Sequence, residues 1–446
     1  MIETRKPLRH FFALISFSFC FFVPLKAQTD KTLTLDQAID LAYKNSGQIQ
    51  TAAAHALAVT AKREQYWAAQ MPNVTANAGY TRISDNITPY VFKFPGSSTE
   101  TVLNPQILNQ VNMRLGAQQT VYAGGRAINF YKSSEFLEKA AQSDVNKDRV
   151  DVKNQVENLF LNILKLERTK KILEENTTVI TSRKNDAINF LKNGTGLEND
   201  VLKADLSLLQ IKTTQTEVEN SIQALKANLV YLLVLPDDTK LTLDDTGAVA
   251  ESNTLPDLAS YQKLIRSRPD FVSADYRKQS LESMLEVAKG NILPVIGVFA
   301  GIVNNSPNQR IFPQTDEFKM TWDAGVTLSY NITSLFTNKY QINEAKQNIE
   351  ASKISLYGIE SIAKGEVANA YYALQSANEK LALYKQAVTQ TTENARVIKN
   401  RYNSQISTIT ESLDADFQAL QAKINLENAV LDTEIARRKL LKSVAK

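Results

Sequence analysis

The chain has 446 residues, of which 43% are hydrophobic and 22% charged, with 15 glycines and 12 prolines; this composition excludes a disordered, collagen-like or polytopic helical membrane protein. The net charge at pH 7 is only +4, so the chain has no basic excess with which to displace counterions, and we expect no nucleic-acid partner. A single cysteine, Cys20, and two histidines, His10 and His55, exclude disulfides within the chain, Cys/His zinc sites and cysteine nucleophiles.

The N-terminus has the pattern of a secretory signal peptide. A basic segment at residues 5–9 precedes an apolar run at 11–23, and we expect residues 1–27 to be removed. A lipoprotein signal that modifies Cys20 is the alternative, but bulky residues at 17–19 stand where small ones are required. Because the signal holds four basic residues and one acidic residue, the remaining chain would carry a charge of +1. It has no apolar run near the roughly 18 residues of a spanning helix, so any membrane insertion must use β-strands.

The remaining sequence repeats one pattern twice, which predicts an internal duplication. The matching segments are 46–79 with 268–301, 155–160 with 366–371, and 200–205 with 411–416. Identities are few, but the order and spacing of the pattern persist. We predict a first repeat at 28–235, a linker at 236–256 and a second repeat at 257–446. Each repeat should contain a helix, two strands, a long helix and a returning helix.

The strands are predicted from four runs of about ten residues with a period of two. They lie at 73–83 and 111–122 in the first repeat, and at 295–303 and 320–331 in the second. Their length suits a tilted membrane-crossing strand, and Trp322 and Tyr330 suit an aromatic girdle. The alternation alone fits a half-buried soluble sheet equally well. The stretches 84–107 and 304–318 are predicted to be loops.

The helices that follow the strands are unusually long. We predict long helices at 126–191 and 338–402, with returning helices at 198–234 and 408–442. Apolar residues every seven positions from 145 to 187, and alternately four and three apart from 370 to 402, form the seams of left-handed coiled coils. A helix of 66 residues is about 100 Å long, far longer than the helices of globular proteins. The two connecting turns are Asn193-Gly194-Thr195-Gly196 and the segment from Ser404 to Ser407.

Four strands per chain predict an oligomer, because open strand edges are not tolerated in lipid. Two chains would give eight strands with a filled interior, whereas three give twelve and leave an aqueous lumen. The small and polar inner faces favour the lumen. We therefore predict a mainly α-helical chain with a membrane β-barrel. In the trimer, a 12-stranded β-barrel would be continuous with a long α-helical coiled-coil barrel.

The arrangement resembles the TolC-like outer-membrane efflux family. The resemblance rests on the duplicated element order, the opening at 33–38, Met71-Pro72, the turn at 193–196 and the helix start at 200–204. It covers residues 32 to about 440, and no single motif is specific. The family implies a passive exit duct in the outer membrane that extends into the periplasm. Its implied partners are a homotrimer, outer-membrane lipid, a periplasmic membrane-fusion adaptor and an inner-membrane transporter.

The resemblance implies export of small molecules such as drugs, toxic compounds or metals through a tripartite pump. An outer-membrane channel for one-step (type I) protein secretion is an alternative that the sequence does not separate. A non-conducting periplasmic coiled-coil protein is a second alternative from another class. Four strands with one apolar face argue against that last alternative, because a fibre does not need them.

The resemblance also assigns residues to two functions at the far end of the long helices. The turns are expected to contact the adaptor through Asn193, Gly194, Thr195, Gly196, Leu197, Ser404, Gln405, Ile406 and Ser407. A helix stop and restart would by itself explain such a turn. Tyr402, Glu411 and Asp414 match the pore constriction of the family, although its arginine near Ser407 is missing here. The favourable placement of acids in a first helical turn is the alternative for Glu411 and Asp414.

No enzymatic site is predicted. His55 lies in an alanine-rich helix and is expected to be packed or to face the lumen. No glycine turn precedes a P-loop lysine. The acidic pairs 237–238 and 244–245 lack EF-hand spacing and are expected to be solvated turns. We therefore expect no catalytic, cofactor-binding or metal-binding residues, and transport driven by partners.

Overall fold

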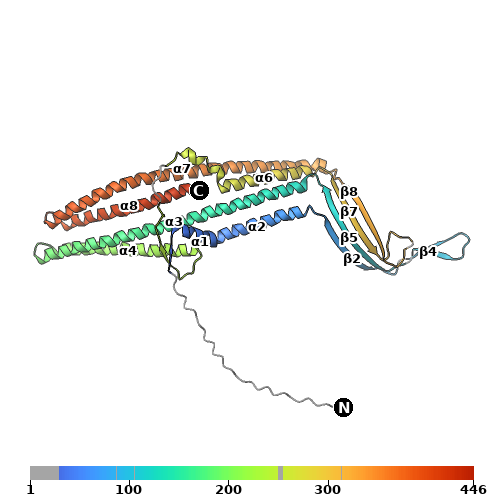
Figure 1. The fold of residues 1–446 in the computed structure, drawn as a ribbon, viewed down its shortest axis with the longest axis horizontal. Helices are drawn as coiled ribbons and strands as arrows, with labels where there is room; N and C mark the ends of the chain where they lie inside the picture. Colours follow the sequence, from blue (N-terminus) through green and yellow to red (C-terminus); the bar gives the residue numbers. More distant parts are fainter. Residues whose placement is uncertain (1–29, 87, 105, 250–254, 313, 446) are drawn as a thin grey trace, which may run out of the picture.

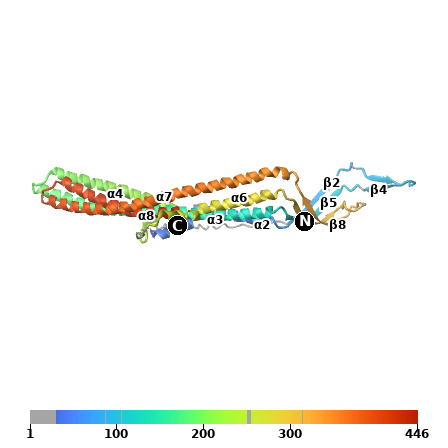
Figure 2. The same ribbon diagram turned by 90° about the horizontal axis from the view of Figure 1, so that it is seen from above.

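The computed structural model describes residues 30–86, 88–104, 106–249, 255–312 and 314–445. The predicted signal peptide at 1–27, with Cys20, lies outside these residues. The described chain is elongated, with two pairs of long helices at one end and a small sheet at the other (Figure 1). The view from above shows the same order along the long axis (Figure 2).

The first repeat contains the two halves of a broken helix, a pair of strands and a pair of long helices. In chain order these are α1 Leu35–Asn45, α2 Gly47–Ala68, β2 Asn73–Arg82, β5 Asn109–Tyr122, α3 Arg126–Lys192 and α4 Glu198–Leu232. A capping box starts α1: Thr34 Oγ1 accepts from the backbone of Gln37, whose side chain accepts from Thr34 N. Two orphan amides at the helix start are thereby satisfied.

The second repeat has the same order. It consists of α5 Leu258–Gln262, a 3₁₀ turn at Ile265–Ser267, α6 Pro269–Gly290, β7 Val295–Asn305, β8 Lys319–Ser329, α7 Ser334–Asn403 and α8 Ile409–Ser443. The strand β8 ends before Tyr330, and α7 begins four residues before the predicted position 338. A Pro at the first helical position suits the start of α6, because its missing N–H is not needed there.

Two stretches that lacked a strand prediction contain strands. The stretch 84–107, predicted to be a loop, holds the hairpin of β3 Tyr90–Lys93 and β4 Glu100–Asn104. Prolines on both sides of these short runs interrupt the alternation, which is why the sequence pattern did not reveal them. The linker at 236–256 contains β6 Lys240–Leu243, which pairs in parallel with β1 Asp30–Leu33. The linker is therefore part of the fold.

The main sheet is antiparallel with the order β2-β5-β7-β8. Its centre is the pairing of β5 from the first repeat with β7 from the second, so the two halves of the chain share one sheet. Residues on one face of the sheet are apolar and exposed; the exposed fraction of Trp322, for example, is 77%. Other members of this apolar face are Val74, Tyr80, Met113, Leu115, Met320, Val326 and Leu328.

The long helices pack as coiled coils along the predicted seams. In α3 the seam positions 145, 152, 173, 180 and 187 are buried, and 159 and 166 are half-buried. In α7 every predicted seam position from Ala370 to Tyr402 is buried or half-buried. Burial therefore confirms the seams. In the described part of the chain, no helix is both long and apolar enough to cross a membrane.

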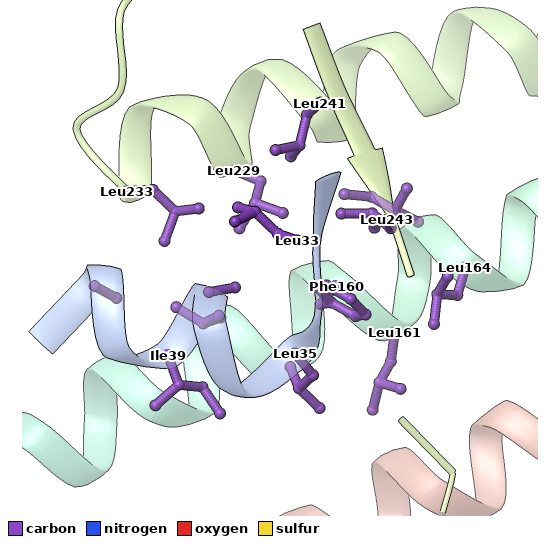
Figure 3. Packing of buried hydrophobic residues seen from close by; sticks show 14 of the residues in the cluster. Leu33, Leu35, Ile39, Phe160, Leu161, Leu164, Leu229, Leu233, Leu241 and Leu243 are labelled. Atoms are coloured by element: carbon purple, nitrogen blue, oxygen red, sulfur yellow. The ribbon is translucent and has the colours of Figure 1, made fainter. Parts of the chain in front are cut away.

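The largest apolar core lies in the middle of the molecule, where the linker strand joins the helices (Figure 3). Leu33 on β1 and Leu243 on β6 are partners in the parallel pair. They pack with Phe160 and Leu161 of α3 and Leu229 of α4. Full burial of each such side chain contributes about 1.5–3 kcal/mol, so this core fixes the helices against the linker.

Candidate functional site

The second face of the sheet is mostly small and polar, with Val295, Phe299 and Val303 of β7 as its large apolar members. One row of register partners crosses all four strands: Thr75, Gly116, Gly301 and Asp323. Because side chains alternate along a strand, every second residue shares this face. We call it the polar face; its other members include Asn77, Gly79, Gln118, Phe299, Thr321, Gly325 and Thr327. A sheet with one exposed apolar face and one small polar face can separate lipid from water.

The polar face carries an ionic cluster that the sequence analysis did not anticipate. Arg114 of β5 donates two hydrogen bonds to Asp323 of β8, of 3.0 and 3.2 Å. Arg310, from the loop before β8, donates to the same carboxylate at 2.5 Å. A β-carbon at Gly301 would lie 3.1 Å from Arg114 Nη2 and 3.2 Å from an Asp323 oxygen. The absence of a side chain at Gly301 therefore makes room for the cluster.

At the opposite end of the molecule, the two turns have the same backbone structure. Gly194 has a φ of +74°, and Gln405, 211 residues later, has a φ of +59°. After each position, the next two amides donate to one carbonyl in the last helical turn, that of Phe190 in the first turn and of Arg401 in the second. The duplication thus extends to individual dihedral angles. A left-handed conformation is costly for a side chain such as Gln405.

The two turns also contact each other, and each presents an apolar side chain. Gln405 Nε2 donates to Thr195 Oγ1 at 2.9 Å. Leu197 and Ile406 are 67% and 68% exposed. A β-carbon at Gly196 would lie 2.8 Å from Leu191 N, so this glycine is required by the close approach of the last turn of α3. The turns form a joint tip with exposed apolar groups, and the adaptor-contact assignment stays a prediction.

The three predicted constriction residues lie near this tip but in different environments. Glu411 and Asp414 are exposed on α8. Glu411 closes a capping box, with its backbone N–H donating to Thr408 Oγ1 and its carboxylate accepting from Thr408 N at 3.0 Å. Its position in a first helical turn thus follows from local helix chemistry. The role of both acids at a constriction stays a prediction.

Tyr402 differs from these acids, because its ring is only 6% exposed in the chain. It packs edge-to-face on Phe190, with ring centroids 5.5 Å apart. Burial raises the pKa of the Tyr402 phenol, and the Asp200 and Asp186 carboxylates raise it further. The phenol therefore stays neutral at physiological pH. In this conformation the ring belongs to the contact between α3 and α7.

A buried ion pair just above the tip was missed by the sequence analysis. Arg183 Nε of α3 donates to Asp416 Oδ2 of α8 at 2.8 Å, and the two side chains are 3% and 7% exposed. Asp186 lies 3.8 Å from the same guanidinium. Half of a signal existed in the sequence, because Arg183 follows the predicted seam residue Ile180 by three positions, where the repeat favours an apolar residue. A charge at a seam position is rare and needs a partner.

A second buried network joins the same helices in the middle of the molecule. Arg438 of α8 donates to Glu157 of α3 and to Glu434 at 2.7 Å each. The side chains of Glu157 and Glu434 are 6% and 3% exposed. Arg438 also reaches the backbone carbonyl of Ala248, which follows β6. Two buried ionic contacts, one near the tip and one at the middle, therefore hold α8 against α3.

The remaining candidates form no chemical centre. His55 is exposed in the chain. Asp244 accepts from the backbone and hydroxyl of Thr246, and Asp245 pairs with Arg168 at 3.1 Å. Asp244 is thus hydrogen-bonded within its own turn, and Asp245 forms an ion pair with α3. Across residues 30–445, outside the few positions not described, no group of three or more His, Cys, Asp or Glu side chains has a metal-binding arrangement.

Known proteins match this chain along nearly its whole length. The family described as "Outer membrane efflux protein" matches residues 38–233 and 260–446. Toxin and drug export protein A of Aggregatibacter actinomycetemcomitans is 21% identical over 365 residues, which cover 76% of each chain. The outer membrane protein VceC of Vibrio cholerae has a TM-score of 0.74 at 16% identity, over 92% of this chain and 96% of that one. The CmeC outer membrane channel of Campylobacter jejuni has a TM-score of 0.72 at 16% identity, over 99% and 94%.

Proposed function

The chain belongs to the outer membrane efflux protein family, and on this premise we propose that it is the passive exit duct of a tripartite efflux pump. The protein resides in the outer membrane and extends into the periplasm. In the proposed pump, an inner-membrane transporter delivers small molecules through a periplasmic adaptor, and the duct releases them outside. The observation that carries the proposal is a four-stranded sheet with one exposed apolar face, one polar face and long coiled coils at one end.

The proposed duct is a trimer. In the described part of the chain, β2 and β8 lie at the edges of the sheet and each pairs on one side only. Unpaired backbone groups facing hydrocarbon cost several kcal/mol each. Pairing β8 of one protomer with β2 of the next satisfies both edges, and three copies close a twelve-stranded barrel wide enough for a lumen. The polar faces would then line this lumen, while Trp322 and Tyr330 would meet the lipid interface.

The purified protein is expected to be a trimer in detergent and to form conducting channels in planar bilayers. Chemical cross-linking and mass measurement of the detergent complex check the first expectation, and single-channel recording checks the second. A protein that stays monomeric after cross-linking, or that yields no conductance, would contradict the duct. A non-conducting periplasmic coiled-coil protein would then be the better explanation.

The second candidate function of the duct is the export of secreted proteins. The relative from Aggregatibacter actinomycetemcomitans is named as an exporter of both toxin and drug, so the same kind of duct fits either cargo. The lumen serves whatever the inner-membrane partner delivers. Deletion of the gene followed by measurement of drug susceptibility and of secreted protein would separate the two routes.

Glu411 and Asp414 are proposed to line the periplasmic entrance. Threefold symmetry would bring six carboxylates around one axis, where they attract cations and repel anions. The double substitution Glu411→Gln and Asp414→Asn removes these charges and keeps the side-chain size. It is expected to lower the cation preference in bilayers, most strongly at low salt, where the screening length exceeds about 10 Å. Trimer yield serves as the control; equal cation preference in parent and variant would leave only the capping role of Glu411.

A further inference from the structure

The strands of the main sheet contain few charged residues. The four strands contain only four charged residues, Arg82, Arg114, Lys319 and Asp323. Arg82 shares the apolar face, because it follows Tyr80 by two residues and donates to Asn109 at the edge of the sheet. Lys319 is at the first position of β8 and pairs with Glu317 of the preceding loop at 2.9 Å. By the same alternation Lys319 shares the polar face, where Glu317 offsets its charge, so Arg114 and Asp323 are the remaining strand charges of this face.

The cluster on Asp323 has an excess of positive charge. Arg114 and Arg310 share this one carboxylate, so the three side chains carry a net charge of +1. Both arginines are 44% exposed, whereas Asp323 is 23% exposed. Each guanidinium has five N–H donors, and Arg114 uses two of them on Asp323. The cluster therefore presents cationic donors to solvent from a fixed position.

The cluster lies in the half of the sheet that is farther from the helices. Arg114 is five residues from the start of β5, and Asp323 is four from the start of β8. The opposite strand ends lead into α3 and α7 (Figure 1). In an outer-membrane duct whose helices lie in the periplasm, the cluster would be in the external half of the lumen. The nearby loop acids are engaged elsewhere, Glu317 by Lys319 and Asp316 by Ser306.

We propose that Arg114, Arg310 and Asp323 form a cationic ring that binds anions in the external half of the lumen. The inference rests on the proposed trimeric duct, in which three copies give a ring charge of +3. Guanidinium groups bind carboxylate and phosphate oxygens with paired, charge-assisted hydrogen bonds. The ring would therefore favour solutes that carry these groups. Its sign is opposite to that of the acidic entrance proposed at Glu411 and Asp414.

Two variants change the ring charge in opposite directions. The double substitution Arg114→Gln and Arg310→Gln leaves Asp323 alone, so the ring charge becomes −3. Asp323→Asn leaves both arginines, so the ring charge becomes +6. The control is Arg82→Gln, which removes one positive charge at the same end of the sheet but on the apolar face. All three proteins are compared as purified trimers.

The first readout is the zero-current potential of single channels under a KCl gradient. We expect it to shift toward K⁺ preference in the double arginine variant and toward Cl⁻ preference in Asp323→Asn. The second readout is block by inorganic tripolyphosphate added to the external side. Loss of the guanidinium donors should weaken this block about tenfold or more, while Arg82→Gln should match the parent.

The two opposite shifts distinguish an electrostatic ring from a structural defect. If both variants shifted the potential in the same direction, or neither shifted it, the cationic ring would be excluded. Equal block of the parent and the double arginine variant by tripolyphosphate would also overturn it. Failure of the parent to conduct or to form trimers would instead contradict the duct itself, so the two hypotheses fail by different results.

Discussion

Replacing Asp416 with alanine is expected to lower the free energy of unfolding by about 3–5 kcal/mol. The reason is the burial of Arg183, whose side chain is 3% exposed and donates to Asp416 at 2.8 and 3.4 Å. Without the carboxylate, the guanidinium is a buried charge with Asp186 at 3.8 Å as its remaining acidic neighbour. Urea unfolding of the detergent-solubilised protein, followed by helical circular dichroism, measures the change.

A double substitution separates two contributions to the free energy of unfolding: the destabilisation by an unpaired buried charge and the net contribution of the ion pair. Arg183→Leu with Asp416→Leu removes both charges and keeps apolar volume in the seam, so its stability should be close to that of the parent. The matched control is the exposed pair of Glu393 and Arg396 on α7, whose side chains are 59% and 60% exposed. Glu393→Ala should leave the free energy of unfolding close to that of the parent, because a solvent-exposed ion pair contributes little to stability. A loss for Asp416→Ala no larger than this control would show that water reaches the pair.

Export is expected to be abolished when Gly194 at the tip is replaced with tryptophan. A β-carbon at Gly194 meets no atom within 4 Å, so the new ring would project from the tip into the space proposed for the adaptor. The φ of +74° adds local strain of about 1–2 kcal/mol. The strain is small compared with the long coiled coils, so the trimer should still assemble. Dye efflux from cells that lack any other duct measures export, and cross-linking measures assembly.

Gly194→Asn is the matched control for the tip. Asparagine accepts a positive φ more readily than most residues and is small, so this variant should export like the parent. Gly196→Ala tests a different property, because its β-carbon would lie 2.8–2.9 Å from Leu191 N and Phe190 C. That variant is expected to distort the last turn of α3. Normal export by Gly194→Trp would remove this turn from the proposed adaptor contact.

The repeated order of helices and strands was predictable because it depends on the local periodicity of apolar residues. Alternation with a period of two marked the four strands of the main sheet, and the seven-residue repeat marked seams whose members, such as Val152 and Leu173, are buried. The tip turn was predictable because Gly194 and Gly196 interrupt a long helical pattern. These signals depend on residues within one or two turns of each other, so no tertiary contact is needed to detect them.

Contacts between distant segments were decided by the tertiary structure. Arg183 and Asp416 are 233 residues apart, and nothing in the sequence near either residue indicates the other as its partner. The cluster of Arg114, Arg310 and Asp323 depends on the pairing of β5 with β7 and of β7 with β8. A heptad pattern identifies which side of a helix is buried, but it does not identify the partner helix or the level at which two charges meet. That information comes from strand register and helix packing, which join parts of the chain that no local pattern connects.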